Sequence, residues 1–79
     1  MVHNKILAYR KQFKVTQDDL AKELEVTKQY VSKLEKEYVI PGLEACFKIL
    51  NAFEKITEKK SNGHLTAHIK LDDMFYVDD

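Results

Sequence analysis

A chain of 79 residues suffices for one small domain, a size at which a single core gives modest stability and a partner subunit often completes the fold. Hydrophobic residues make up 44% of the chain and Pro occurs once, which excludes a disordered protein and favours a compact helical one. One cysteine, Cys46, excludes an internal disulfide. With no signal peptide or membrane-spanning segment in the sequence, we expect a cytoplasmic protein.

The formal net charge is zero, which at first sight argues against a nucleic-acid partner. The charges are nevertheless unevenly distributed, because basic residues gather in the first half, whereas Lys70 is the only basic residue from Ser61 onwards, against four aspartates. This distribution permits an anionic partner for the basic part. Charge runs of this kind also occur simply as solvated faces, so that reading stays open.

Three short helices are predicted in the first half of the chain. Apolar residues at helical spacing indicate the first over 3–13. Thr16 precedes a run with Leu20 and Leu24 on one face, and its hydroxyl is well placed to cap a helix over 16–24. Thr27 is placed in the same way before a third helix that runs to about Lys36. The tight connection between the second and third helices has the spacing of a helix-turn-helix unit.

The second half is predicted to hold one long helix and a smaller element. Residues 37–42 form a connector, because Pro41 disfavours helical backbone before it. From Leu43 a broad apolar stripe indicates a fourth helix. Asn62-Gly63 can either end that helix or form a hairpin turn. Alternation over 65–71 predicts a short strand, and residues 71–76 a last helical turn or two.

In combination, these residues resemble the Cro and repressor helix-turn-helix proteins of phages, the XRE-like family. The resemblance covers about residues 6–53 and rests on Arg10 six residues before Thr16-Gln17, the run TQDDLAKEL, Val26-Thr27, Val31-Ser32-Lys33 before Leu34-Glu35, and Pro41 with Leu43. It implies an all-α, lambda-repressor-like domain of four to five compact helices, with a short C-terminal β element at most. Lys14 and Glu25 stand where the family usually has glycine, and a left-handed residue other than glycine costs about 1 kcal/mol.

The resemblance assigns DNA contacts to the third helix, which in such proteins lies in the major groove. Its base-contacting positions correspond to Lys28, Gln29, Ser32 and Lys33. Glutamine can bond bidentately to adenine and lysine can donate to guanine, whereas the plainer reading is four ordinary exposed residues. By the same resemblance Arg10 and Glu35 form an ion pair that orients this helix.

Phosphate contacts are expected beside the third helix. Gln17 matches a phosphate-binding position of the family, at a helix N-terminus that offers its own amide groups. Lys36 and the backbone around Gly42 are placed to hold the opposite strand. Tyr30 either packs against the domain or reaches a phosphate.

Catalysis and metal binding have little support in the sequence. His64 and His68 are four residues apart, but neither a CxxC nor an HExxH motif accompanies them. The pair Asp72-Asp73 is better explained as acidic charge at a helix start. We therefore expect no enzymatic activity, no metal, no cofactor, no small-molecule ligand and no membrane partner.

The sequence as a whole predicts a bacterial or phage-encoded transcriptional regulator that binds double-stranded DNA as a homodimer. All 79 residues are expected to form one domain, with a helical core over 3–56 and a C-terminal extension over 57–79 that dimerises through Leu65, Ile69, Met74, Phe75 and Tyr76. The alternative is a protein-interaction module on the same fold, such as an antitoxin or antirepressor, which the zero net charge permits.

Overall fold

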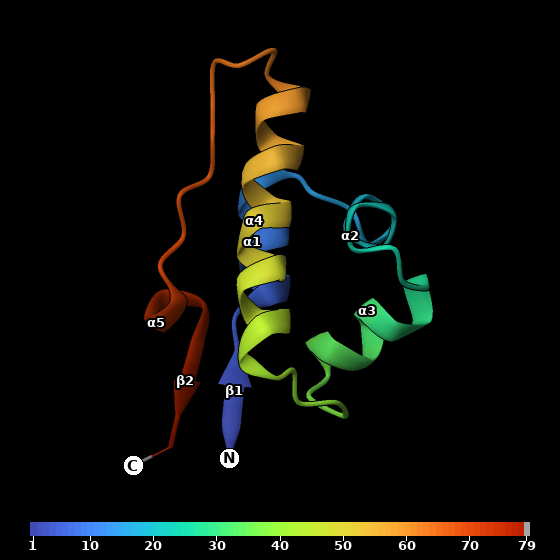
Figure 1. Ribbon diagram of the computed structural model, residues 1–79, viewed down its shortest axis with the longest axis vertical. Coiled ribbons are helices and arrows are strands. Elements are labelled where there is room, and N and C mark those ends of the chain that lie inside the picture. Colours follow the sequence, from blue (N-terminus) through green and yellow to red (C-terminus); the bar gives the residue numbers. More distant parts are fainter. Residues whose placement is uncertain (79) are drawn as a thin grey trace.

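The computed structural model describes residues 1–78 and shows helices packed around one long central helix, with a small sheet at one end (Figure 1). The elements in chain order are β1 (Val2–Asn4), α1 (Ile6–Phe13), α2 (Gln17–Leu24), α3 (Lys28–Glu35), α4 (Leu43–Lys60), α5 (Leu71–Met74) and β2 (Phe75–Val77). Helices α2 and α3 lie to one side of α4, and the C-terminal segment descends on the other (Figure 1). The predicted all-α class with a short C-terminal β element is confirmed.

Threonine side chains begin both α2 and α3, as predicted. Thr16 Oγ1 accepts a hydrogen bond from the Asp19 amide at 3.0 Å, and Asp19 Oδ2 accepts one from the Thr16 amide at 2.9 Å. This reciprocal capping box satisfies two amides that the helix leaves free. Thr27 Oγ1 likewise accepts from the Tyr30 amide at 3.0 Å. The polar caps thus set where the two helices of the helix-turn-helix start.

Left-handed residues end α1 and α2 at the two positions expected to hold glycine. Lys14 has φ 57° and Glu25 has φ 58°. In each turn the next amide reaches back to a helix carbonyl, Val15 to Arg10 and Val26 to Ala21. Because these bonds satisfy carbonyls at the helix ends, they stabilise a conformation that a side chain with a Cβ otherwise disfavours.

The core forms where one face of α4 meets the apolar sides of α1, α2 and α3. Phe53, at the middle of α4, is completely buried. Around it lie aliphatic residues from every part of the chain, among them Ile6, Val15, Leu20, Val31, Leu34, Ile49, Ile56 and Met74. Burial of these side chains is the main stabilising contribution and determines which side of α3 remains in solvent.

The predicted first helix begins too early. His3 and Asn4 belong to β1, which pairs antiparallel with β2 so that His3 lies opposite Tyr76 and Asn4 opposite Phe75. Helix α1 starts only at Ile6, whose amide donates to Asn4 Oδ1 at 3.1 Å. The contact that selects strand over helix comes from residues more than 70 positions away, which helical periodicity cannot reveal.

The strand predicted over 65–71 is wrong, because the described chain offers this segment no partner strand. Instead the Ala67 amide donates to Thr57 Oγ1 at 2.8 Å, and that hydroxyl donates to the Phe53 carbonyl at 2.7 Å. Ala67 is buried, and Ile69 and Leu71 are partly buried against the core, whereas Leu65 is exposed, so the alternation reflects packing against the helical core at three of its four apolar positions. Left-handed Asn62 and Gly63 follow the end of α4, and they do not form a hairpin.

The predicted boundary at residue 57 does not correspond to a break in the fold. Helix α4 runs through it to Lys60, and Thr57 is buried. Met74 and Phe75, expected on a dimer surface, belong to the core with exposed fractions of 0% and 9%. The helical turn predicted over 71–76 stops at Met74, and β2 begins directly after it.

The last residue, Asp79, lies outside the described residues. No helix among those described has the length and apolar character needed to cross a membrane.

Candidate nucleic-acid interface

Helix α3 has one buried side and one side open to solvent. Val31 and Leu34 are buried with exposed fractions of 1% and 2%. The opposite side carries the residues expected to contact bases: Lys28, Gln29 and Lys33 are exposed and Ser32 is half-buried. All four lie within two turns, so a single straight surface presents them together. The structure therefore brings the four predicted residues to one accessible helix face.

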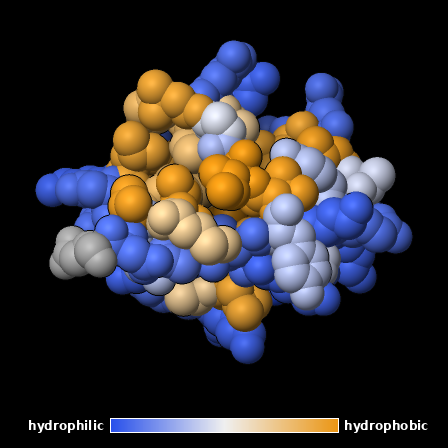
Figure 2. Space-filling view, turned by 90° about the horizontal axis from the view of Figure 1, so that it is seen from below, coloured by the Kyte–Doolittle hydropathy of each residue, from blue (hydrophilic) through white to orange (hydrophobic). Residues whose placement is uncertain are grey.

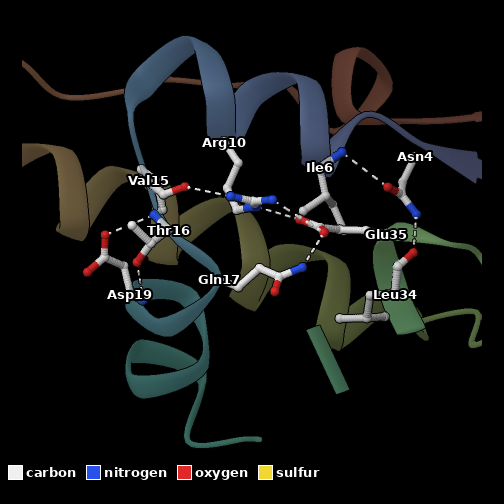
Figure 3. A network of polar contacts seen from close by, with 9 residues as sticks. All are labelled: Asn4, Ile6, Arg10, Val15, Thr16, Gln17, Asp19, Leu34 and Glu35. Atoms are coloured by element: carbon white, nitrogen blue, oxygen red, sulfur yellow. Dashed lines mark hydrogen bonds and ion pairs between the residues drawn. The ribbon is translucent and has the colours of Figure 1, made fainter. Parts of the chain in front are cut away.

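A polar network holds the C-terminal end of α3 to α1 and α2 (Figure 3). Arg10 Nε and Glu35 Oε2 form an ion pair, and Arg10 Nη2 donates to Glu35 Oε1 at 3.4 Å. Arg10 Nη1 also donates to the Val15 carbonyl at 3.2 Å, which ties the guanidinium to the turn after α1. The exposed fractions of these side chains are 16% for Arg10 and 6% for Glu35, so water screens the pair only weakly.

Gln17 joins this network through its side chain. Its Nε2 donates to Glu35 Oε1 at 2.7 Å, so one amide hydrogen is engaged inside the protein and the second remains for another acceptor (Figure 3). The sequence pattern did not indicate this contact. Because Gln17 stands in the first turn of α2, it links the N-terminus of that helix to the C-terminus of α3. The Glu35 carboxylate accepts hydrogen bonds from three donors, two on Arg10 and one on Gln17, and thereby holds the angle between the two helices.

The remaining residues expected to contact phosphate differ in their surroundings. Lys36 and Gly42 are exposed, and Gly42 begins α4 with an ordinary extended backbone and nothing within 4 Å of an added Cβ. Tyr30 is half-buried and packs against the core, where it lines a hollow of about 210 Å³ with Leu34, Pro41 and others. Of the two possibilities left open for Tyr30, packing against the domain is thus present.

Ion pairs engage two of the three acidic residues of α2, whereas the lysines on and directly after α3 have no such partner among residues 1–78. Lys60 Nζ lies 2.6 Å from Asp19 Oδ2, and Lys59 Nζ lies 3.3 Å from Glu23 Oε1. Burial raises the pKa of Asp19, but hydrogen bonds from Lys60 and Thr16 outweigh it and leave that pKa below its ordinary value. Among residues 1–78, Lys28, Lys33 and Lys36 form no ion pair. The exposed side of α3 is therefore locally positive although the whole chain is neutral.

A second set of contacts, here called the clasp (His3, Asn4, Glu37 and Asp78), joins the small sheet to the end of α3. Asn4 Nδ2 donates to the Leu34 carbonyl at 2.8 Å, and the Asn4 amide donates to Glu37 Oε2 at 3.0 Å. His3 lies between two carboxylates, with Nδ1 at 2.9 Å from Glu37 Oε1 and Nε2 at 2.7 Å from Asp78 Oδ1. These contacts join residues at least 30 positions apart in the sequence, and no sequence pattern indicated them.

The carboxylates of the clasp shift the titration of its histidine. Hydrogen bonds to Asp78 and then to Glu37 raise the pKa of His3, and the same contacts lower the pKa of both carboxyls. Glu37 takes part in the clasp from a left-handed backbone conformation, with φ 63°. The residue directly after α3 is therefore held by the N-terminal strand, so that both ends of the described chain contribute to the position of α3.

Potential metal ligands do not converge in this fold. Within the described part of the chain, no three His, Cys, Asp or Glu side chains are grouped so that they could hold a metal ion. His68 instead lies 3.6 Å from Glu54. Burial raises the pKa of the Cys46 thiol, which keeps it protonated and unreactive at neutral pH.

Comparison with known proteins places these features in context. A family model described as "Helix-turn-helix" matches residues 6–58, which include α1 to α3 and most of α4. An uncharacterized HTH-type transcriptional regulator of Methanocaldococcus jannaschii is 33% identical over 76 residues, covering 96% of this chain and 94% of that protein. No solved structure gives a significant match. The matched region ends before α5, and it contains neither strand of the sheet.

Proposed function

Because the chain belongs to the helix-turn-helix family of the Cro and repressor (XRE) type, we propose that it is a transcriptional regulator that reads double-stranded DNA through α3. The observation that carries this proposal is the solvent-exposed side of α3. There Lys28, Gln29 and Lys33 are exposed, no ion pair neutralises either lysine among residues 1–78, and the Glu35 network fixes the helix.

Chemistry divides the exposed residues into two roles. Gln29 can bond bidentately to adenine and Lys28 can donate to guanine, so these two residues near the helix N-terminus carry sequence discrimination. Ser32 adds a hydroxyl that accepts or donates. Lys33 lies one turn further along α3 and contacts either a base or the adjacent phosphate. Their combined action is recognition of a few base pairs in the major groove.

Phosphate contacts set the register without reading the bases. Lys36 and the amides at the start of α4, next to Gly42, face one strand, whereas the N-terminus of α2 with the second Nε2 hydrogen of Gln17 faces the other. The hydroxyl of Tyr30 can add a contact because its ring is only half-buried. In this arrangement the network around Glu35 transmits the position of Gln17 to the recognition helix.

A two-fold operator is the expected target, with half-sites about one helical turn apart, roughly 34 Å, and one protein copy on each. The protein then acts in the cytoplasm without cofactor or catalysis. Repression follows when the site overlaps that of the transcription machinery. The neutral overall charge keeps non-specific attraction to DNA low, so the contacts of α3 must provide most of the discrimination.

The test is DNA selection with the purified full chain, followed by binding titrations on the selected sequence. Gln29→Ala and Lys28→Ala should change the base preference, each at a cost of about 1–3 kcal/mol. Lys36→Ala should weaken binding to all sequences and reduce the slope of log affinity against log salt by about 1. Lys33→Ala separates the two contacts open to that residue, because loss of a base contact changes the base preference and loss of a phosphate contact does not. Lys55→Ala, an exposed lysine on α4, is the matched control.

Unchanged preference in both the Gln29 and Lys28 variants would contradict reading by α3. Absence of any selected sequence would favour the alternative, a protein-interaction module such as an antitoxin or antirepressor on the same fold. A shallow salt slope, equal for the wild-type chain and the Lys36 variant, would point the same way.

A further inference from the structure

The C-terminal end of α3 is fixed at Glu37, two residues beyond the helix. Glu37 is left-handed, and its amide donates to the Leu34 carbonyl at 3.1 Å. The Tyr38 amide donates to the Lys33 carbonyl at 3.0 Å. These two bonds form a Schellman motif, whose left-handed position ordinarily holds glycine because a Cβ disfavours that conformation. The last turn of the recognition helix therefore depends on how firmly Glu37 is held.

The clasp provides the contacts that hold Glu37. Its Oε1 lies 2.9 Å from His3 Nδ1, and its Oε2 accepts a hydrogen bond from the Asn4 amide at 3.0 Å. The other left-handed residues that carry a Cβ form no ion pair among residues 1–78. The side chains of His3 and Glu37 are 20% and 24% exposed, so their surroundings limit the access of water to this contact.

The other side of the clasp is firmly anchored, because the small sheet is attached to the core. The Lys5 amide donates at 2.8 Å to the carbonyl of Met74, which is completely buried. Asn4 lies opposite Phe75, which is buried as well. The sheet and the connector after α3 meet at the lower end of the molecule in Figure 1, where Figure 2 shows hydrophobic side chains gathered on the face. A change at His3 is thus transmitted to the connector more readily than to the sheet.

His3 faces acidic groups from two elements. Glu37 approaches from the connector after α3, and Asp78 Oδ1, directly after β2, lies 2.7 Å from the Nε2 atom of the imidazole. The Tyr76 ring on β2 lies 5.2 Å from the imidazole, and Lys5 Nζ lies 5.6 Å from the centroid of the Tyr76 ring. The N-terminal amino group adds an attraction to Asp78. The two carboxylates dominate, and the pKa of His3 is raised, first by Asp78 and then by Glu37.

The two ring nitrogens of His3 make the clasp dependent on protonation. A charged imidazole donates from both nitrogens and serves Glu37 and Asp78 together, whereas a neutral imidazole has a single N–H. When His3 loses its proton, one carboxylate loses its donor, and the bond that remains comes from a neutral donor and is weaker. In either neutral tautomer Glu37 is therefore held less firmly, by the Asn4 amide and at most one weaker bond from His3.

We propose that His3 is a positioning residue for DNA recognition, which in its protonated form holds Glu37 and with it the C-terminal end of α3. This inference rests on the proposed function, because it requires that α3 reads the bases. If the helix is held correctly only part of the time, the apparent affinity falls in proportion to that fraction. A charged and a neutral donor differ in strength by a factor of about five in an equilibrium. Sequence-selective binding should therefore weaken roughly fivefold as His3 loses its proton.

The test compares two duplexes of equal length, the selected sequence and a scrambled one, in titrations with the full chain at constant salt from about pH 5.5 to 8.5. The ratio of the two affinities should fall about fivefold, with a midpoint above 6.5, the ordinary pKa of His3. A mere loss of positive charge lowers both affinities alike and leaves the ratio constant. His3→Gln should abolish the pH dependence of the ratio. His64→Gln is the matched control and should keep it, since His64 is exposed and forms no ion pair among residues 1–78.

Two carboxylate variants separate positioning from titration. Glu37→Gln leaves His3 beside Asp78, so the ring still titrates, but the ratio should no longer follow its charge. Asp78→Asn removes the larger cause of the raised pKa of His3, so the step in the ratio should persist and move to lower pH. A step of undiminished size in Glu37→Gln or His3→Gln would overturn the proposal. Circular dichroism at each pH checks that every variant remains folded.

NMR spectra of the full chain without DNA test the same contact. The amide signals of Glu37 and Tyr38 should titrate with the midpoint of the His3 ring, and these shifts should vanish in His3→Gln. Amides that do not follow His3 would overturn the proposal whether or not DNA binds. A chain that selects DNA with a constant ratio refutes this inference alone. A chain whose amides follow His3 but that selects no sequence refutes the proposed function, and with it the role of His3 in recognition.

Discussion

The substitution Glu35→Ala tests whether the network at the end of α3 orients the recognition helix. It removes the acceptor of Arg10 and Gln17, whereas Arg10 keeps only the Val15 carbonyl. The Arg10 side chain is 16% exposed, so its charge would lose most of its compensation in a poorly solvated place. We expect the free energy of unfolding to fall by about 3 kcal/mol. This is the lower end of the range for a broken buried ion pair, because Arg10 still donates a hydrogen bond to the Val15 carbonyl.

For a chain of this length a total stability of about 4–12 kcal/mol is typical, so the variant should remain folded but melt roughly 15 °C lower. Glu35→Gln should lose about half as much, because an amide oxygen still accepts hydrogen bonds but carries no charge. DNA affinity should fall in the same order. The measurement is urea unfolding followed by circular dichroism, together with binding titrations of the same preparations.

Glu58→Ala is the matched control, since Glu58 is exposed on α4 and its side chain forms no ion pair or hydrogen bond among the described residues. Its effect should stay within about 0.5 kcal/mol. A loss below about 1 kcal/mol in Glu35→Ala, the range of exposed ion pairs, would refute the reasoning, because the pair would then be solvated. Lower stability with unchanged DNA affinity would refute only the link to recognition.

Three further predictions concern the turns, the clasp and the C-terminal segment. Glu25→Gly should stabilise the protein by about 0.5–1 kcal/mol in urea unfolding, because the backbone at Glu25 is left-handed, with φ 58°. Lys22→Gly, inside α2, is the control and should cost about 1 kcal/mol. A destabilised Glu25 variant would contradict the left-handed turn. The clasp should stabilise most below the ordinary pKa of His3, 6.5, and its contribution should disappear as pH rises through the raised folded pKa. On the acid side, the pKa values of Glu37 and Asp78 are lowered, so the stabilisation by the clasp is present above their ordinary pKa values of 4.5 and 3.8 and is lost as pH falls further. His3→Gln should flatten the alkaline part of a profile of melting temperature against pH. An unchanged profile would argue against the clasp. Thr57→Val should cost about 1–3 kcal/mol, because the buried Ala67 amide loses its acceptor, and hydrogen exchange at Ala67 should accelerate; unaltered exchange would show that the segment over 64–70 is held by packing alone.

Local chemistry in the sequence determined the helices of the first half. Hydroxyl caps at Thr16 and Thr27, the apolar spacing between them and the short turn depend on contacts within a few residues, so pattern alone could identify them. The apolar stripe from Leu43 identified α4 in the same way, but it did not determine where that helix ends. The residues proposed to contact DNA on α3 followed from position in the motif, and the structure shows that they share one exposed face.

Only the tertiary structure decided the contacts between distant parts of the chain. Helical spacing over 3–13 concealed β1, because a strand of three residues forms only when β2 lies beside it. Alternation over 65–71 suggested a strand, but the Ala67 amide donates its hydrogen bond to the Thr57 hydroxyl in α4 instead of to a second strand. Neither Glu37 nor Asn4 carries a local signal for the clasp. A local pattern records which residues prefer a helix or a buried face, whereas strand pairing and side-chain networks depend on what the rest of the chain brings next to them.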